Sequence, residues 1–423
     1  MITSTARPTS NSPCSITREI YSGWNAIGLG NGLFKLFIVP EIGGRVIQLR
    51  LGAQDCFYVN PRHLGRVYSP EQNNFDSGWK NYGGSKVWPA PQGWSSDAEW
   101  PGPPDPVLDG GAYSCRILDD KSETAAVLLE SPADDYTGLT FARELRIFQD
   151  TTTVHIRHTM RNTAARPVRW GIWQVTQHAV NGDIAVFTRA RTYRQMLGDQ
   201  AYASIRLDPD TKLWRLRYAD QVAKFAVRPE DGWVATLDSQ RRIAHVETFQ
   251  LFTGVPYPDG APLELWVNGR GSYTIHGDRM ETQKDPNGCD PFLETEVLSP
   301  LAELQPGQEY TFHSAWHCTA IDADAVLRVA DCGAVARALE VQHREKQLRV
   351  TGSFGLFHAA IAELVGTYRA GKEKAHVLGA ATPLVPCVVD QLFPYEDGLS
   401  QISLRLRRPD GKLLGTVDHA TVC

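Results

Sequence analysis

The sequence lacks several features that would assign it to common classes of protein. Its eight cysteines, among 423 residues, show no CxxC spacing. This scatter argues against a zinc knuckle or a disulfide framework and favours free, mostly buried thiols. No apolar run approaches the roughly 20 residues needed to span a bilayer. There is also no GxGxxG, P-loop, GxSxG or HExxH pattern, so the sequence does not support nucleotide-cofactor or serine-hydrolase chemistry.

Charge of one sign is not concentrated anywhere in the chain. The formal net charge is -5 and the isoelectric point is near 6.2, with charged residues spread along the sequence. This distribution provides neither a nucleic-acid-binding surface nor a basic membrane-binding arm, so we expect no nucleic acid and no membrane as partners. It leaves the oligomeric state open. The first twenty residues contain no apolar segment typical of a secretory signal, so we expect a cytoplasmic protein.

The dominant period of the sequence is two residues, which is typical of strands. The segment VHIRHTMRN, at 154–162, alternates apolar and polar side chains, and FKLFIVP and RVIQLRLG are two further strands separated by EIGG. Turn sequences such as DPDTK, YPDG and RPDGK recur at short intervals. The pattern predicts an all-β chain of sandwich or barrel type. The best helix candidate, 322–348, is rich in β-branched residues and is interpreted as mixed.

Length and pattern also predict the domain organisation. A chain of this size, with 42% hydrophobic residues, is long enough for more than one domain. We expect an N-terminal segment at 1–24, a large β domain at 25–320 and a small β-sandwich at 321–423. The boundary near 320 follows a closing pair of predicted strands, and the remaining residues have a strand pattern of their own.

Three segments resemble the galactose mutarotase-like superfamily. NGLFKLFIVPEIGGRVIQLRLG (31–52) resembles its opening hairpin. VTQHAVNGD (175–183) is similar to its Thr-Asn-His strand, with Gln177 in place of Asn and without the aromatic residues that usually follow. FLETEVLSPLAELQPGQEY (292–310) resembles the strand that carries the general-base glutamate of aldose 1-epimerases. The resemblance covers about 25–320 and implies a galactose mutarotase-type β-supersandwich, most like an uncharacterised bacterial branch.

The resemblance implies a catalytic pair. Ring opening of an aldose needs a base at the anomeric hydroxyl and an acid at the ring oxygen, flanking one sugar. His178 would be the acid, and Glu294 or Glu296 the base. The two glutamates are spaced i, i+2 and share one strand face, while Thr295 faces the other way. The alternatives are a strand-end histidine bound to a loop, and glutamates on a solvated outer face.

The stretch NYGGSKVWPAPQGW (81–94) is the predicted cavity wall. Trp88 and Trp94 could stack on a pyranose, and Lys86 could bind a hydroxyl or the carboxylate of a uronic acid. The alternative is a buried plug made with Trp79 and Trp100. The remaining substrate-binding candidates are Gln174, Gln177 and Glu247. For Glu247 the equal alternative is a buried ion pair within the protein.

These observations together predict a carbohydrate-active protein. The expected activity is that of an aldose 1-epimerase-like isomerase that acts on a mono- or oligosaccharide without a cofactor or a metal site. A polysaccharide lyase or glycoside hydrolase on the same scaffold, and a sugar-binding protein without catalysis, are the alternatives, since the superfamily contains lyases and binding domains.

Overall fold

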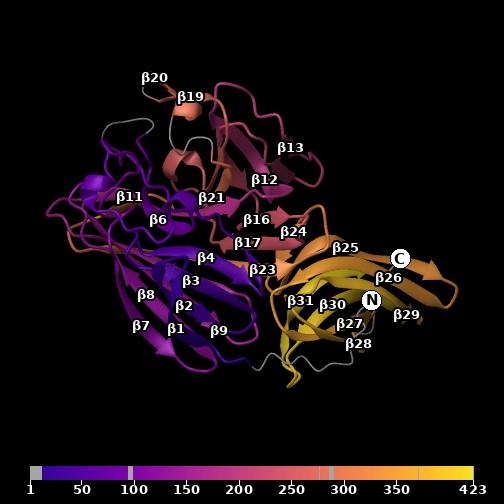
Figure 1. The fold of residues 1–423 in the computed structure, drawn as a ribbon. Coiled ribbons are helices and arrows are strands. Elements are labelled where there is room, and N and C mark those ends of the chain that lie inside the picture. Colours follow the sequence, from indigo (N-terminus) through magenta and orange to yellow (C-terminus); the bar gives the residue numbers. More distant parts are fainter. Residues whose placement is uncertain (1–11, 94–98, 276, 285–289, 370, 423) are drawn as a thin grey trace.

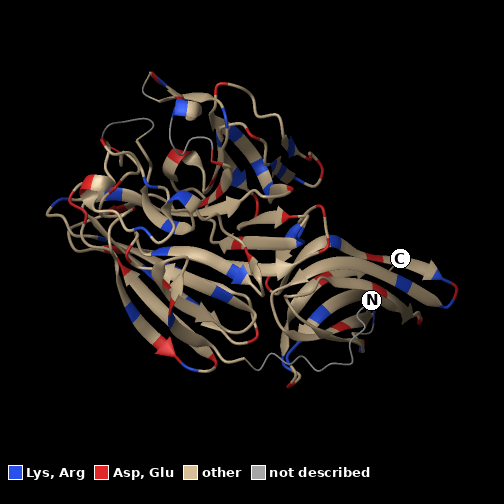
Figure 2. Cartoon of the chain, viewed as in Figure 1, with Lys and Arg blue, Asp and Glu red and all other residues tan. Residues whose placement is uncertain are grey.

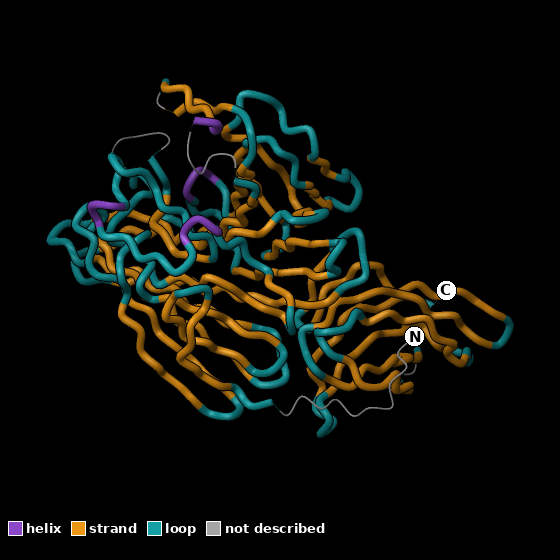
Figure 3. The backbone as a smooth tube through the Cα atoms, in the orientation of Figure 1, coloured by secondary structure: helices purple, strands orange, loops and turns teal. Residues whose placement is uncertain are grey.

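The structure is a computed structural model that describes residues 12–93, 99–275, 277–284, 290–369 and 371–422. In these ranges the helices are four short 3₁₀ turns, η1 (Pro61–His63), η2 (Pro70–Gln72), η3 (Pro258–Gly260) and η4 (Thr282–Lys284). Strands make up most of the rest (Figure 3). Within the described residues no helix has the length and apolar character needed to cross a membrane.

The large N-terminal part consists of two antiparallel sheets. The front sheet has the order β1-β2-β3-β4-β6-β11-β21-β18-β15, with the short β5 at β4 and β22 at β11. Its strands are β1 (Ser15–Tyr21), β2 (Trp24–Gly30), β3 (Phe34–Val39), β4 (Arg45–Leu51), β5 (Gln54–Asp55), β6 (Ser85–Ala90), β11 (Val168–Ala179), β15 (Ala223–Pro229), β18 (Leu263–Asn268), β21 (Phe292–Leu298) and β22 (Ala302–Leu304).

The back sheet has the order β7-β8-β9-β10-β23-β17-β16. Its strands are β7 (Ser114–Asp120), β8 (Thr124–Glu130), β9 (Leu139–Phe148), β10 (Val154–Asn162), β16 (Trp233–Asp238), β17 (Ile243–Phe249) and β23 (Glu309–Ala320). The long strand β12 (Ile184–Leu197) pairs with β16 at one end and with β15 at the other, so it joins the two sheets. Beside it lie β13 (Ile205–Leu207) and β14 (Leu213–Arg217), and a separate hairpin is formed by β19 (Ser272–Ile275) and β20 (Asp278–Glu281).

Burial along the strands follows from this arrangement. Strand β10 alternates buried and more exposed residues, because only one of its faces packs against the front sheet. In β21 every residue is buried. One face of the strand packs on the inter-sheet core, and loops cover its other face, on the outer side of the front sheet. The inter-sheet core includes Leu36, Leu145, Ile156 and Trp316. All strand pairings in the described chain are antiparallel, as a β-supersandwich requires.

The C-terminal part is a β-sandwich of two four-stranded sheets, on the right in Figure 1. One sheet has the order β24-β25-β26-β29 and the other β28-β27-β30-β31. The strands are β24 (Arg328–Ala330), β25 (Gly333–Arg344), β26 (Gln347–Leu356), β27 (Ala360–Tyr368), β28 (Glu373–Ala381), β29 (Cys387–Pro394), β30 (Leu399–Arg407) and β31 (Leu413–Thr421). The sandwich encloses its own core, which includes Leu348, Phe354 and Leu404.

The predicted fold class, an all-β supersandwich followed by a small β-sandwich, is confirmed. The mixed segment 322–348 contains strands β24 and β25 and no helix, and the buried residues of β25, among them Val335 and Leu339, pack on the core of the C-terminal sandwich. Charged side chains of both signs are spread over the elements of both parts (Figure 2).

Candidate functional site

A cavity of about 460 Å³ lies over the front sheet. Its volume is in the range of about 300–1,000 Å³ that is usual for small-molecule sites. Side chains of five adjacent strands line it: Trp88 of β6, Trp173 of β11, Lys224 of β15, Trp266 of β18, and Glu294 and Glu296 of β21. The rest of the lining comes from loops, from the ends of β18 and β21, and from the β19–β20 hairpin with η4, and these residues are Phe75, Trp79, Gln92, Gly93, Pro101, Pro103, Pro104, Asn268, Phe292, Tyr273, Ile275, Met280, Glu281 and Thr282.

Strand register decides which side chains face this cavity. Residues directly opposite each other in antiparallel strands point to the same side of the sheet. Gln177 of β11 lies opposite Glu294, and Val175 lies opposite Glu296. The same register places Lys86 beside Val175 on the cavity side. The next residues along each strand point the other way, into the space between the two sheets, and these are Gln174, Thr176, His178 and Thr295.

A buried ion pair forms one part of the cavity floor. Lys86 Nζ lies 3.1 Å from Glu294 Oε1, and Gln177 Nε2 donates to the same oxygen at 2.7 Å. Burial lowers the pKa of Lys86, and the nearby Glu294 carboxylate partly opposes that effect. The ammonium also lies 4.4 Å from the centre of the Trp88 ring. The ammonium of Lys86 is therefore already paired with groups of the protein itself.

A buried triad of charged groups forms the other part of the floor. Lys224 Nζ contacts Glu264 Oε2 at 2.8 Å and Glu296 Oε2 at 2.7 Å. Burial raises the pKa of Glu296 to about 7 and that of Glu264 to about 8. Burial alone would lower the pKa of Lys224, but the two carboxylates raise it above its ordinary range. One ammonium thus faces two carboxyl groups, and Glu296 is able to change its protonation state near neutral pH.

Four of the tryptophans at or behind the cavity wall, Trp79, Trp88, Trp100 and Trp173, lie close together. The Trp88 ring centre lies 5.4 Å from that of Trp173 and 5.3 Å from that of Trp100. The indole N–H groups of Trp100 and Trp79 donate to Asp105 and Asp109, which anchors these two rings in the loop.

The indole nitrogens of Trp88 and Trp173 have no hydrogen-bond partner among the described residues. The segment 81–93 therefore forms both a wall and a plug. Trp94, the other predicted stacking residue, lies outside the described residues.

The predicted arrangement of His178 and a glutamate across one cleft is wrong. The His178 side chain points into the inter-sheet space, where Nε2 lies 2.8 Å from Thr295 Oγ1. Burial lowers the pKa of His178 to about 3. On β11 it is Gln177, one residue earlier, that reaches the cavity side. The structure does place Glu294 and Glu296 on one face and Thr295 on the other, and both glutamates are buried, so they do not form a solvated outer face.

The other predicted binding residues are divided between the two faces. Lys86, Trp88 and Gln177 are on the cavity side, whereas Gln174 and Glu247 are in the inter-sheet space. There Glu247 accepts hydrogen bonds from Gln174, Thr176, Thr295 and Trp316. Burial raises the pKa of Glu247 to about 7, and these donors oppose that rise.

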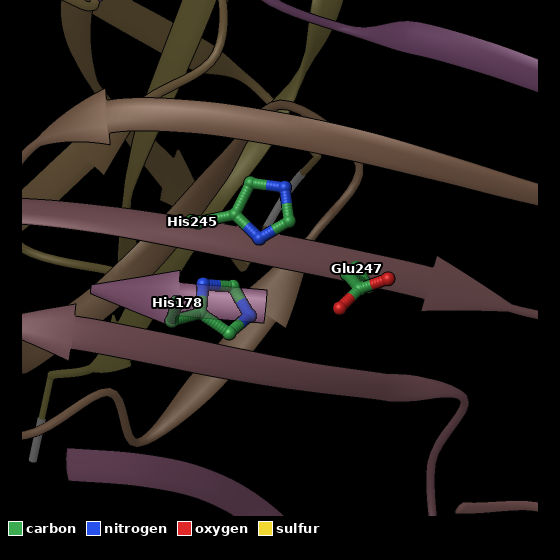
Figure 4. A group of neighbouring side chains, drawn as sticks. All are labelled: His178, His245 and Glu247. Carbon is green, nitrogen blue, oxygen red and sulfur yellow. The ribbon is translucent and has the colours of Figure 1, made fainter. Parts of the chain in front are cut away.

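Metal-binding side chains occur together in this same space. Ligand atoms of His178, His245 and Glu247 all lie within 4.8 Å of one another, and Figure 4 shows the two imidazole rings beside each other with the carboxylate to one side.

Among the lining residues of the strands, the sequence did not point to Trp173, Lys224 and Trp266, nor to Glu264, which pairs with Lys224 beside the cavity. Lys224 and Glu264 each interrupt a short apolar strand, AKFAVRP and LELWVN. A single charge on a strand that is otherwise apolar is a signal of a paired or functional group. The pairing itself joins segments about 40 and 70 residues apart, and only the folded sheet shows it.

Several solved structures are similar to this chain at low sequence identity. A TPR-domain containing protein from Parabacteroides distasonis is 14% identical with a TM-score of 0.49, and the match covers 70% of this chain and 47% of that chain. A galactose mutarotase-like protein from Clostridium acetobutylicum is 12% identical with a TM-score of 0.45, covering 73% and 99%. A galactose mutarotase-like protein from Lactobacillus casei is 10% identical with a TM-score of 0.42, covering 70% and 100%. At these values the similarity does not indicate an activity.

No curated protein matches the chain. One family model matches residues 25–319, which is more than half of the sequence and corresponds to the two-sheet part described above. The match agrees with the uncharacterised branch that the sequence resemblance indicates, and the chain belongs to the family of the domain of unknown function DUF4380.

Proposed function

We propose that the cavity binds a sugar ring and interconverts its anomers, so that the protein is an isomerase of the aldose 1-epimerase type. The observation that carries the proposal is the pair of carboxyl groups on the cavity floor. Glu294 is held by Lys86, and Glu296 by Lys224, and both lie below the rings of Trp88 and Trp173. Ring opening breaks the bond between C1 and the ring oxygen while one proton leaves the anomeric hydroxyl and another reaches the ring oxygen, so an acid and a base can perform it without a cofactor.

The roles of the two glutamates follow from their surroundings. Glu294, in an ion pair with Lys86, is the base that takes the proton of the anomeric hydroxyl as the ring opens and returns it to the C1 oxygen as the ring closes on the other face. Glu296, with a pKa raised to about 7 by burial, is the acid that protonates the ring oxygen and then takes that proton back. A general acid is most effective when its pKa is near the working pH. The rings of Trp88 and Trp173 meet the C–H face of the sugar, and their unpartnered indole N–H groups can bind hydroxyls.

The charges of the floor favour a neutral sugar over a uronic acid. Lys86 pairs with Glu294, and Lys224 pairs with two carboxylates, so neither ammonium is available to a uronate. A polysaccharide lyase would need such a positive group, so this alternative has less support.

A second candidate is a sugar-binding protein without catalysis. The position of His178 on the far side of the sheet favours it, because the acid of the resembled enzymes is then missing from the cavity. The two candidates share the binding site and differ in turnover.

The test is anomeric exchange of free aldoses, measured by NMR with the purified chain, with neutral and uronic-acid oligomers as further substrates. Glu296→Gln and Glu294→Gln should each lower the exchange rate by about 10² to 10⁴, while sugar binding, followed by titration, changes far less. Glu281→Gln is the matched control, because Glu281 lines the same cavity at its exposed hairpin. Binding without exchange would establish the second candidate. Absence of both for all sugars would contradict the proposal.

A further inference from the structure

The inter-sheet space below the cavity holds a second cluster of reactive side chains, independent of the proposed sugar chemistry. His178 comes from β11 of the front sheet, and His245 and Glu247 come from β17 of the back sheet. We infer that these three side chains bind a divalent transition-metal ion, zinc first among them, which ties the two sheets together. The sequence contains no closely spaced metal-ligand motif and so predicted no metal, whereas these three ligands come from two strands that are distant along the chain.

His245 is the strongest indication of a ligand. Its side chain is buried, and neither Nδ1 nor Nε2 has a hydrogen-bond partner among the described residues. The rings of His178, Phe57 and Trp316 surround it, with centres 5.3, 5.3 and 5.7 Å away. Two unpartnered polar atoms on one buried side chain are rare in proteins. A metal ion takes the lone pair of one ring nitrogen and so gives that nitrogen a partner, while the N–H of the other nitrogen stays without one.

Glu247 completes the donor set and is already oriented for it. Its Oε2 accepts from Gln174, Thr176 and Trp316, and its Oε1 accepts from Thr295. Metal-binding carboxylates are typically held by such outer hydrogen bonds.

The carboxylate also lacks a direct cationic partner. Among the described residues none forms an ion pair with Glu247, and the buried Arg143, whose charge acts on it from a distance, donates its hydrogen bonds to Ser85. A buried carboxylate without an adjacent cation is costly, and a divalent ion would supply the missing charge.

The geometry requires only small movements. Ligand atoms on one tetrahedral zinc ion are about 3.3 Å apart, given bonds of about 2.0–2.1 Å. The three donors already lie within 4.8 Å of one another, and His178 Nε2 would exchange Thr295 Oγ1 for the ion. Two imidazoles and a carboxylate suit zinc and its neighbours in the transition series better than calcium or magnesium, which prefer oxygen ligands. None of the three residues lines the cavity, so this site is separate from the proposed sugar site.

The experiment uses the untagged full chain, dialysed after addition of zinc, with its metal content measured by plasma mass spectrometry and its Tm by calorimetry. We expect about one equivalent of metal per chain. Removal of the metal by a chelator should lower the Tm, and zinc should restore it. Glu247→Gln and His245→Asn should lower retained metal at least tenfold. His317→Asn, a buried histidine of the back sheet, and His376→Ala, an exposed one, are controls that should retain it.

The inference is overturned if the wild-type chain retains no stoichiometric metal and zinc leaves its Tm unchanged. It is also overturned if Glu247→Gln and His245→Asn hold as much metal as the wild type, since the metal then lies elsewhere. If His245→Asn does not fold, the absorption spectrum of the cobalt-substituted wild type decides. Bands of a four-coordinate site with nitrogen and oxygen ligands, altered in Glu247→Gln, support the site, and a six-coordinate aquo spectrum refutes it.

Discussion

Strands β11 and β21 carry different chemistry on their two faces. Toward the cavity they present Gln177, which donates a hydrogen bond to Glu294, and the two glutamates, Glu294 paired with Lys86 of β6 and Glu296 paired with Lys224 of β15. Toward the back sheet they present His178 and Thr295, which form a hydrogen bond with each other. Both faces are buried, yet only one borders a cavity. A buried polar residue on such a strand therefore has no assignable role until its face is known.

The largest effect is expected from Lys224→Met. This change leaves Glu264 and Glu296 buried without their shared cation. Breaking a buried ion pair from one side typically costs about 3–5 kcal/mol, so the free energy of unfolding in urea should fall by that amount. Lys372→Met, at an exposed position, is the control and should leave it unchanged. A loss below about 1 kcal/mol would mean that the triad is not intact in solution.

His178→Ala should affect stability and leave sugar binding unchanged. The substitution removes a buried side chain and the hydrogen bond with Thr295, which should lower the free energy of unfolding by about 2–3 kcal/mol. Because the side chain lies behind the front sheet, the Kd for a sugar that binds the cavity should stay within about twofold in a titration of the folded variant, well under the tenfold that 1.4 kcal/mol produces. A folded variant with tenfold weaker binding would place His178 at the cavity after all.

The pH dependence of stability should differ between the wild type and Glu296→Gln. The pKa of Glu296 is about 7 in the folded chain against 4.5 for the free side chain. Because the folded state holds the proton of Glu296 more tightly than the unfolded state, this proton stabilises the fold fully below pH 4.5. The stabilisation is lost as the pH rises to about 7. From pH 5 to pH 8 the wild type should therefore lose stability relative to Glu296→Gln, by up to about 1.4 kcal/mol per pH unit. Parallel curves in urea denaturation would contradict the raised pKa.

The smallest effect is expected for an exposed ion pair of the C-terminal sandwich. Arg349 Nη2 lies 2.8 Å from Asp390 Oδ2, and both side chains are exposed. Solvent screens such pairs, so Asp390→Asn should leave the Tm unchanged within error, in contrast to the buried pairs under the cavity. A clear fall in the Tm would show that this pair stabilises the fold more than an exposed ion pair normally does.

Much of the fold could be predicted from local sequence. The alternation in 154–162 predicted strand β10, and the Pro and Gly-Gly pattern after residue 39 predicted the hairpin of β3 and β4. The i, i+2 spacing of Glu294 and Glu296 also predicted correctly that they share a face. The pairing of Glu296 with Lys224 could not be predicted, because strand neighbours that are distant in sequence are chosen by the whole sheet.

The sequence by itself determined the all-β class, the two parts of the chain and the two-residue period that separates Glu294 and Glu296 from Thr295. These follow from local turn chemistry and strand periodicity, which act within a few residues. Only the tertiary structure decided which face of β11 borders the cavity and which faces the back sheet. Both faces are buried, so both contain apolar residues, and the period of two is the same whichever way the strand is turned. Packing of the two sheets against each other decides the orientation of β11, which places Gln177 toward the cavity and His178 toward His245.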